Sequence, residues 1–581
     1  MLDDLNPQQR EVTELRHHCV AIACPGAGKT KTIATKAALL LQEDQGIVGA
    51  VTFSKDAALE LRTRILAGAS SSAKKRLIAG TFHSLAFKQL ARPGSRSPDI
   101  ASDGDRMGLV IRVMQDLGME GKAEDVIPTI EKIKTNFGRV DPASEDGRFY
   151  QAYQDALARN GKIDFQDMLR LAVAGMEAGT ILPYPFKHLL VDEFQDTDPL
   201  QYRWIELHAI AGAVVTVVGD DDQSIYAFRA ALGYRGMETF IKQFEAKPVV
   251  LGSNYRCRSE ILAAADRLIR KNVDRIPKVL RAEKGAGGRV ESSRHDDEYA
   301  EAVAAVEALG SHLARGKSCA ILARTNRILD PLEAVCRSHG VKYYRASGKS
   351  VLKLPEGALM CDLLEIVERV KVTGLDSVLA HSGMRNEQLR SLHQSMGAEL
   401  TMKGRAELVN LGLSEDVATN YREFMKRLTE WQGLSDRGFH SLTLSGVSEW
   451  MMKYAKKESA TRAIQATYEV LSRLTGSFQD RIDFLQQDNN QPAPDALILT
   501  TMHSSKGLEW DHVWIARAEE TIVPDEKSTE PEERRLFYVA MTRARESLMI
   551  SAIKKNYTSR FVVEAELATV DAGDKLRVGV A

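Results

Sequence analysis

The sequence predicts an α/β protein built on two parallel sheets, each interrupted by a helical segment. Short, fully apolar runs alternate with segments of helical composition, a rhythm typical of parallel strands covered by helices on both faces. This alternation of apolar and helical segments occurs once before residue 246 and again after it. The 581 residues exceed what one hydrophobic core can serve, and about three to five units are expected at this length.

Four candidate strands lie before residue 246 and belong to the first predicted sheet. They are Cys19–Ala23, Gly49–Phe53, His188–Val191 and Val214–Val218. The first is stopped by Pro25 and Gly26 and is followed by a helical segment at residues 31–41, whereas the last two end at acidic residues. Because ligands of open parallel sheets bind beyond the carboxyl ends of the strands, we expect the functional site there.

The candidate strands of the second predicted sheet begin near residue 246, and the last of them lie near the end of the chain. Its candidate strands are Pro248–Leu251, Cys319–Ala323, Leu497–Thr501, Val513–Ala516 and Leu548–Ser551. Segments 91–160 and 356–494 are helix-rich and carry no chemical motif. We therefore predict that each sheet domain holds one helical insertion.

Composition and charge narrow the class of protein. Hydrophobic residues make up 44% and charged residues 27%, as in ordinary globular proteins, and the net charge is −1. Any nucleic-acid site must therefore depend on a local group of positively charged residues, because the chain as a whole is not basic. The six cysteines form no C-x-x-C pair, which argues against a zinc ribbon or an iron–sulfur cluster. The acidic N-terminus and the absence of a long apolar run predict a cytoplasmic protein without membrane association.

A phosphate-binding loop is the first chemical signature. The segment Ala23-Cys24-Pro25-Gly26-Ala27-Gly28-Lys29-Thr30 lies between a predicted strand and a predicted helix. Its glycines allow backbone amides to approach a phosphate, the lysine can meet the β- and γ-phosphates, and the threonine hydroxyl can hold Mg²⁺. The usual pattern G-x-x-x-x-G-K-[ST] is broken at Ala23, so a chance glycine-rich turn is the alternative.

An acidic pair is the second signature. Asp192 and Glu193 follow the apolar run that ends at Val191. The aspartate can hold Mg²⁺ through water, and the glutamate can orient and deprotonate an attacking water. An exposed acidic strand end is the alternative, and it becomes less plausible because the phosphate loop precedes the pair in the expected order.

Three further polar residues complete the candidate catalytic set. Gln223 follows a predicted strand and can hydrogen-bond a γ-phosphate, while Arg256 and Arg543 can place positive charge on a leaving phosphoryl group. Taken singly, an arginine more often forms a surface salt bridge than a contact of this kind. The spacing does not show that they converge.

As an ordered series, these segments resemble the motifs of superfamily 1A DNA helicases of the UvrD/Rep/PcrA type. The matching segments are Leu5–Gln9, Ala23–Thr30, Thr52–Ala58, Gly80–Ser84, Asp192–Thr197, Gly219–Arg229, Ser253–Arg256, Thr501–Trp510 and Arg535–Arg545. They run from residue 5 to residue 545, almost the whole chain. One departure is Phe228, which stands where the family usually has tryptophan.

The resemblance implies two RecA-like P-loop NTPase cores with ATP and Mg²⁺ between them. The first core would comprise residues 1–84 and 161–245 with insertion 85–160, and the second core residues 246–355 and 495–581 with insertion 356–494. One wall of the ATP site would be formed by Gln9, Gly26, Ala27, Gly28, Lys29, Thr30, Lys31, Asp192, Glu193 and Gln223. The other wall would be formed by Arg256, Glu509 and Arg543, and Tyr255 would stack on the adenine.

The resemblance also implies a DNA-binding face. Its residues would be Phe53, Phe82, His83, Tyr226, Phe228, Arg229 and His503. Aromatic side chains there can stack on bases without reading their sequence. Each of these residues could instead belong to the core or the surface, and for an aromatic chosen at random the core is the more frequent place.

The activity that the resemblance implies is ATP-driven 3′→5′ movement on single-stranded DNA and unwinding of duplex DNA in repair, replication or recombination. The alternatives are a protein-stripping translocase, a weakly unwinding subunit of a nuclease or defence complex, and a regulatory DNA-binding subunit with a relict ATP site. The expected partners are single-stranded DNA, single-strand/duplex junctions and a nuclease or repair protein, with the chain a monomer or weak oligomer.

Overall fold

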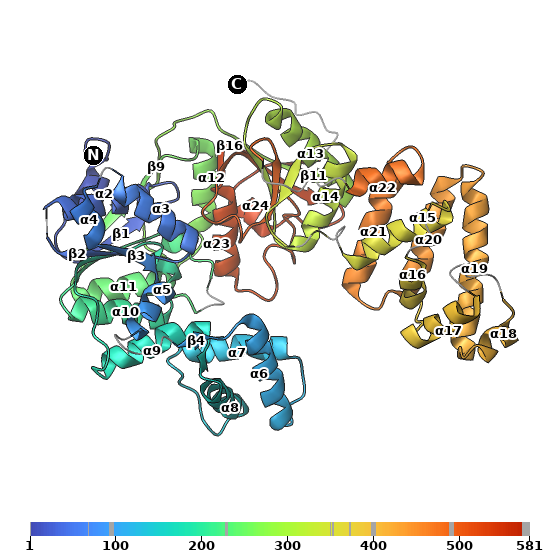
Figure 1. The fold of residues 1–581 in the computed structure, drawn as a ribbon. Helices are drawn as coiled ribbons and strands as arrows, with labels where there is room; N and C mark the ends of the chain where they lie inside the picture. Colours follow the sequence, from blue (N-terminus) through green and yellow to red (C-terminus); the bar gives the residue numbers. More distant parts are fainter. Residues whose placement is uncertain are drawn as a thin grey trace, which may run out of the picture. The chain divides into compact units, whose positions relative to one another are not determined.

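The computed structural model describes residues 2–43, 45–67, 69–91, 98–226, 230–348, 350, 354–370, 374–396, 403–486 and 493–571. The chain forms two compact units, each containing one large sheet (Figure 1). Unit 1 comprises Met1–Gly288 and Glu526–Thr542, and unit 2 comprises Arg289–Asp525 and Arg543–Ala581. Both contain segments from distant parts of the sequence.

The sheet of unit 1 has six parallel strands in the order β3-β2-β6-β7-β1-β8. Their bounds are β1 Cys19–Ala23, β2 Ile47–Thr52, β3 Leu77–Thr81, β6 Phe186–Val191, β7 Val214–Gly219 and β8 Lys247–Leu251. The order switches direction at β1, so the loop after this strand lies where open parallel sheets bind their ligands.

Helices cover both faces of this sheet, as the apolar strands predict. Alternate residues of β1 enter different cores: Val20 packs in the same cluster as Trp204, and Ala21 in the same cluster as Leu40. The helices of the first cluster are α5 Phe82–Leu90, α9 Phe165–Glu177, α10 Pro199–Ile210 and α11 Gly233–Phe244. Those of the second are mainly α2 Lys29–Glu43 and α3 Lys55–Leu66, to which α1 Pro7–Glu14 and α4 Ser71–Arg76 each add one buried residue. Also in unit 1 are α12 Ser259–Ile269 and α23 Glu530–Met541.

One predicted strand belongs to the other sheet. The run Pro248–Leu251 was expected to open the second sheet, but β8 pairs in parallel with β1 along its whole length, from Cys19 opposite Lys247 to Ala23 opposite Leu251. That prediction is wrong because an apolar run reveals a strand and not its partner. The short ribbon of β9 Ser253–Asn254 and β10 Arg281–Ala282 follows, still within unit 1. The division of the chain at residues 84, 160, 245, 355 and 494 stays a prediction.

The first helical segment has a core of its own. It comprises α6 Asp103–Asp116, α7 Ala123–Thr135 and α8 Glu145–Arg159, flanked by the paired strands β4 Asp99–Ile100 and β5 Lys162–Ile163 (Figure 1). Phe149 and Tyr153 are buried in this core. The Nζ of buried Lys134 lies 2.6 Å from Asp164 Oδ2 and 2.7 Å from Asp167 Oδ2, so a compensated ion cluster ties α7 to the start of α9.

Unit 2 contains a seven-stranded parallel sheet in the order β13-β14-β12-β15-β16-β11-β17. The strands are β11 Arg289–His295, β12 Cys319–Ala323, β13 Tyr343–Arg345, β14 Leu497–Thr501, β15 Trp510–Ile515, β16 Ala544–Ile553 and β17 Thr569–Asp571. Four of them, β12, β14, β15 and β16, overlap the remaining predicted strands. The main helices packed on this sheet are α13 Glu298–Leu313 and α14 Leu329–Ser338.

The second helical segment interrupts this sheet between β13 and β14. Its helices are α15 Pro355–Val367, α16 Leu375–His381, α17 Asn386–Met396, α18 Arg405–Asn410, α19 Glu415–Ser435, α20 His440–Tyr454, α21 Glu458–Arg473 and α22 Phe478–Gln486 (Figure 1). They share a core centred on residues such as Phe424, Trp431 and Trp450. Among the residues that the structure describes, no helix combines the length and apolar character needed to cross a bilayer.

Candidate nucleotide-binding site and nucleic-acid interface

The phosphate loop connects β1 to α2, which confirms the predicted strand–loop–helix context. Gly26 and Gly28 have φ angles of +62° and +73°, a left-handed conformation that suits glycine. A Cβ atom on Gly26 would lie 2.6 Å from the Cβ of Arg256, so the nearby segment around Arg256 also excludes a side chain at this position. The loop thus needs its glycines for both backbone angle and space.

Lys29 is the first residue of α2, and its ammonium group faces the acidic pair. Its Nζ lies 3.6 Å from Glu193 Oε1. Burial alone would lower the pKa of Lys29, but the nearby carboxylates, led by that of Glu193, outweigh this effect and raise the pKa above its ordinary value. Lys29 is therefore charged at neutral pH and can meet an anionic ligand.

Asp192 and Thr30 provide oxygen donors beside this lysine. Burial, followed by the charge of Glu193, raises the pKa of Asp192 to about 7, and Thr30 hydrogen-bonds to the carboxyl group. A buried carboxylate whose charge is not fully compensated, next to a hydroxyl, is a donor set that suits Mg²⁺. The predicted metal-binding pair therefore fits the ion chemically.

Glu193 is held by the residues that follow β6. Its φ angle is +51°, its backbone N–H donates to Asp192 Oδ1 at 2.9 Å, and Gln195 Nε2 donates to its Oε2 at 2.5 Å. Gln195 Oε1 in turn accepts from the backbone N–H of Asp220 at 2.9 Å. The end of β6 is thereby connected to the end of β7.

The N-terminal helix α1 brings Gln9 to the phosphate loop. Gln9 closes a capping box with Asn6, and its Nε2 donates to the backbone oxygen of Ala27 at 2.9 Å. Asn6 Nδ2 also donates to the hydroxyl of half-exposed Tyr255 at 2.9 Å. Lys31, by contrast, is exposed and donates to the backbone oxygen of Asp4 at 2.7 Å. The predicted adenine contact of Gln9 and the predicted nucleotide contact of Lys31 stay predictions.

Tyr255 and Arg256 lie on the same unit as Lys29, and not on the second core where the sequence placed them. Asn254 Nδ2 donates to the backbone oxygen of Pro25 at 2.6 Å, and Tyr255 N donates to that of Gly26 at 3.0 Å. Arg256 Nη1 donates to the backbone oxygen of Thr542 at 3.2 Å. The physical reason is the pairing of β8 with β1, which leads residues 253–256 directly along the phosphate loop.

Three predicted site residues belong to unit 2. Arg543 is 1% exposed, and its Nη1 donates to the backbone oxygen of Leu508 at 3.1 Å. Glu509 pairs with Arg545 at 2.6 Å. Burial lowers the pKa of His503 to about 4, so this imidazole is neutral at pH 7. Their contributions to nucleotide or DNA binding stay predictions.

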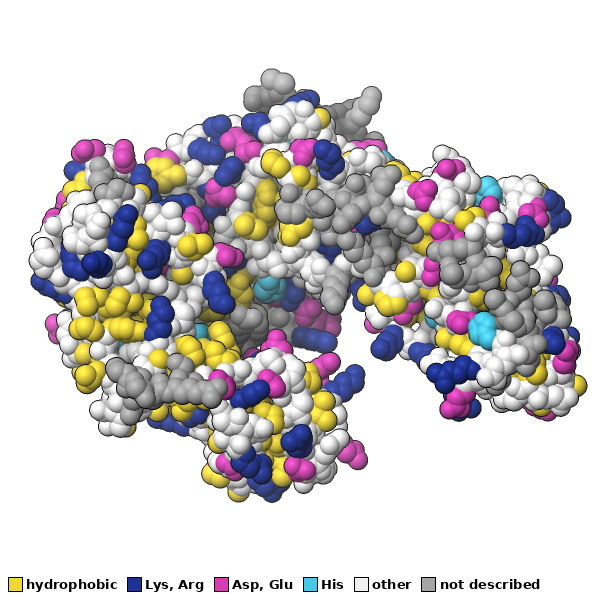
Figure 2. Space-filling view, in the orientation of Figure 1, with side chains coloured by type: hydrophobic (Ala, Val, Ile, Leu, Met, Phe, Trp, Pro, Cys, Tyr) yellow, Lys and Arg dark blue, Asp and Glu magenta, His cyan; other side chains and the backbone are white. Residues whose placement is uncertain are grey.

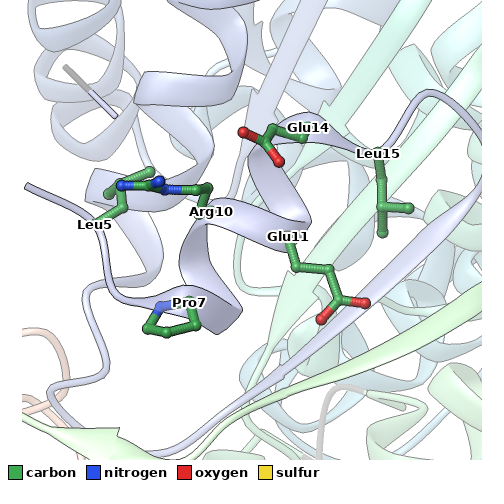
Figure 3. Close-up of a pocket in the computed structure, with 6 residues that line it drawn as sticks. All are labelled: Leu5, Pro7, Arg10, Glu11, Glu14 and Leu15. Atoms are coloured by element: carbon green, nitrogen blue, oxygen red, sulfur yellow. The ribbon is translucent and has the colours of Figure 1, made fainter. Parts of the chain in front are cut away.

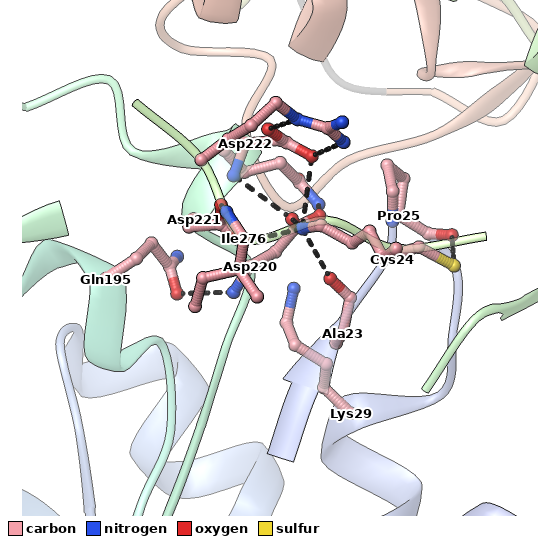
Figure 4. A network of polar contacts seen from close by, with 12 residues as sticks. Ala23, Cys24, Pro25, Lys29, Gln195, Asp220, Asp221, Asp222 and Ile276 are labelled. Atoms are coloured by element: carbon pink, nitrogen blue, oxygen red, sulfur yellow. Dashed lines mark hydrogen bonds and ion pairs between the residues drawn. The ribbon is translucent and has the colours of Figure 1, made fainter. Parts of the chain in front are cut away.

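Three consecutive aspartates after β7 form a buried ionic cluster that sequence reasoning missed (Figure 4). The carboxylates of Asp220, Asp221 and Asp222 converge as metal ligands do, but Lys278 Nζ lies among them at 2.6, 2.7 and 3.1 Å. The ammonium group thus occupies the position that a cation would take. Gln223, the predicted γ-phosphate contact, donates from Nε2 to Asp220 Oδ2 at 2.5 Å. Nothing in the local sequence around Lys278 marks its role.

Two aromatic stacks lie on unit 1, and each pairs an exposed ring, Phe53 or Phe165, with a partly buried one. Phe53 and Tyr226 are parallel, with ring centroids 6.0 Å apart and an interplanar angle of 1°. His83 stacks on Phe165 at 4.1 Å and 19°, and Phe165 is 47% exposed. Phe165 was not predicted, because an isolated phenylalanine at a helix start resembles a core residue in sequence.

Phe82 does not join these stacks. It is 3% exposed and packs edge-on against Trp204 at 5.7 Å, so the prediction that it stacks on bases is wrong. Phe82 is a core residue, the alternative given for each aromatic, because it starts α5, whose inner side covers the sheet. Phe228 and Arg229 lie outside the described residues. Positive and negative side chains are interspersed on the face shown in Figure 2, so charge alone marks no DNA-binding surface there.

A separate pocket of about 530 Å³ lies beside α1 (Figure 3). It is lined by Leu5, Pro7, Arg10, Glu11, Glu14 and Leu15. Two carboxylates and one guanidinium are a poor match for a triphosphate. The lining includes neither Lys29 nor Glu193, so this pocket is not the phosphate site.

The fold and the site define a P-loop protein with two RecA-like parallel sheets. The sequence matches the UvrD/REP helicase N-terminal domain over residues 5–245 and the UvrD-like helicase C-terminal domain over residues 249–367 and 417–555. The chain therefore belongs to the UvrD-like helicase family.

Curated relatives are similar over nearly the whole chain. DNA helicase II of Haemophilus influenzae is 28% identical over 97% of this chain and 87% of its own length. The ATP-dependent DNA helicase Rep of Escherichia coli is 26% identical over 95% of this chain and 91% of its own length. The ATP-dependent DNA helicase Srs2 of Schizosaccharomyces pombe is 26% identical over 95% and 72%.

Proposed function

We propose that this protein is an ATP-hydrolysing DNA helicase that moves 3′→5′ along single-stranded DNA and unwinds duplex DNA ahead of it. One observation carries the proposal: the Lys29 ammonium lies 3.6 Å from Glu193, at the carboxyl ends of β1 and β6. These strand ends are where open parallel sheets bind ligands. The names of the relatives, DNA helicase II, Rep and Srs2, support DNA as the substrate.

The residues of the phosphate loop and the acidic pair have distinct roles in hydrolysis. The glycine loop and Lys29 bind the β- and γ-phosphates, while Thr30 and Asp192 hold Mg²⁺. The bound ion supplies charge that stabilises the phosphate oxygens. Glu193 orients the attacking water and accepts its proton. Gln223, Arg256 and Arg543 are assigned the γ-phosphate contacts.

Single-stranded DNA is the proposed ligand of the two aromatic stacks on unit 1. The rings of Phe53, Tyr226 and Phe165 offer π-faces that tolerate any base. His83 supports Phe165, and burial lowers the pKa of this histidine, so it contributes stacking and not charge at pH 7. Binding through such faces suits a motor that must move over every sequence.

Replacing Phe53 with alanine is expected to weaken binding of single-stranded DNA by about 1–3 kcal/mol, the contribution of one base–aromatic stack. The change also removes the partner of Tyr226. Fluorescence anisotropy with a labelled oligonucleotide measures the affinity. Leu182→Ala is the control, since Leu182 is 82% exposed and apolar but is not aromatic. Equal DNA affinities in the two variants would contradict the assignment.

Partial duplexes with one single-stranded tail test the proposed activity. With ATP and Mg²⁺, we expect displacement of the strand from a duplex with a 3′ tail and little displacement with a 5′ tail. A preference for the 5′ tail would contradict the polarity. Release of a protein block without strand separation would favour a protein-stripping translocase. We place this activity in the cytoplasm, in repair, replication or recombination, with a nuclease or repair protein as partner and the chain as a monomer or weak oligomer.

A further inference from the structure

Lys278 is fully buried in a cluster that joins three segments of unit 1. It lies between α12 and β10, and its Nζ donates to the backbone oxygen of Ala23 at 3.1 Å as well as to the aspartates after β7. Ala23 is the last residue of β1, immediately before the phosphate loop. One ammonium group therefore contacts the start of the phosphate loop and the end of β7 together.

The cluster keeps this lysine charged. Burial by itself lowers the pKa of Lys278, but the three aspartates raise it well above the ordinary value. Arg275 forms a two-point contact with Asp222, at 2.9 and 2.7 Å, and the backbone N–H of Ile276 donates to Asp221 Oδ2 at 2.7 Å. Segment 275–278 thus supplies the positive charge that the buried carboxylates require.

Asp220 connects Lys278 to Gln223, the predicted γ-phosphate contact. Its Oδ1 accepts from Lys278 at 2.6 Å, and its Oδ2 accepts from Gln223 Nε2 at 2.5 Å. Asp220 is completely buried, so its carboxylate has little freedom once both partners are bound. The orientation of the Gln223 amide consequently depends on where Lys278 holds Asp220.

We propose that Lys278 is a positioning residue that fixes the Gln223 amide relative to the phosphate loop, with its ammonium group taking the place of a structural metal ion. This inference rests on the proposed ATP hydrolysis and extends it to a residue outside every recognised motif. Lys278 acts on the hydrolysis step through Asp220, and it does not contact the nucleotide. Loss of the ammonium group should therefore lower kcat for ATP and leave nucleotide binding nearly unchanged.

The test uses a charge-balanced variant, since Lys278→Met alone leaves an uncompensated buried carboxylate and can unfold the protein. Adding Asp221→Asn removes one negative charge and preserves an acceptor for the Ile276 N–H. In Lys278→Met/Asp221→Asn we expect thermal stability near that of the wild type, an unchanged Kd for a fluorescent ATP analogue, and kcat lower by about ten- to a hundredfold. Lys271→Met is the control, because Lys271 is exposed and lies, like Lys278, between α12 and β10.

A double-mutant cycle separates positioning from a purely structural role. If Lys278 acts through Gln223, adding Gln223→Ala to the charge-balanced variant should lower kcat no further. Two results would overturn the proposal. One is a wild-type kcat in the charge-balanced variant, and the other is a combined loss of kcat equal to the product of the separate losses from the charge-balanced change and from Gln223→Ala. Failure of the proposed function would appear differently, as a wild-type protein without ATP turnover.

Discussion

Replacing Lys29 with alanine is expected to lower kcat/KM for ATP by about a thousandfold or more, the scale of losing one cationic contact to a transferring phosphoryl group. Lys29 is buried and charged and faces Glu193 at the end of β1. Lys29 is the one positively charged residue of the phosphate loop, and the Nζ of the nearby Lys31 donates to the backbone oxygen of Asp4 instead. Steady-state phosphate release and binding of a fluorescent ATP analogue measure the loss.

Lys74→Ala provides the matched control for this experiment. Lys74 is an exposed lysine on α4 of the same unit and is outside the site. The control should hydrolyse ATP at the wild-type rate. Because Lys29→Ala also leaves the neighbouring carboxylates without their ammonium partner, its thermal unfolding midpoint must be measured alongside. A folded Lys29→Ala protein with normal turnover would contradict the phosphate-loop assignment.

Replacing Glu193 with glutamine is expected to retain nucleotide binding while lowering kcat by about a hundred- to ten-thousandfold, the range for removing a general base. The glutamine side chain keeps an oxygen for the hydrogen bond from Gln195 Nε2. It removes the negative charge opposite Lys29, so affinity for an anionic nucleotide should not fall. Single-turnover hydrolysis and a binding titration separate the two properties.

Glu14→Gln serves as the matched control for this change, since Glu14 is an exposed carboxylate at the end of α1. It should leave both binding and hydrolysis unchanged. Hydrolysis at the wild-type rate in Glu193→Gln would show that another group accepts the proton. Loss of nucleotide binding in Glu193→Gln would instead assign the residue to binding.

The sequence predicts strands where they are buried on both faces. The runs Cys19–Ala23 and Cys319–Ala323 coincide with β1 and β12, because these strands are apolar and buried throughout. By contrast, β11 reads Arg-Val-Glu-Ser-Ser-Arg-His and has only two fully buried side chains, so it carries no apolar signal. The sheet to which β8 belongs could not be predicted either, since pairing is a long-range property.

The residues of the candidate site likewise divide into those that the sequence reveals and those that it does not. Lys29, Thr30, Asp192 and Glu193 can be found because their chemistry requires fixed neighbours in sequence, and the structure brings all four together. Lys278 cannot be found this way, because its partners precede it by more than fifty residues and a single lysine has no pattern. Phe82 shows the converse, since a motif position does not reveal that a ring faces the core.

ATP hydrolysis by the wild-type protein, measured with and without single-stranded DNA, tests the central claim most directly. If the site at the ends of β1 and β6 drives movement on DNA, the rate of phosphate release will rise with oligonucleotide concentration and then saturate. A rate that is the same at every oligonucleotide concentration, or no hydrolysis at all, would contradict a DNA-coupled motor.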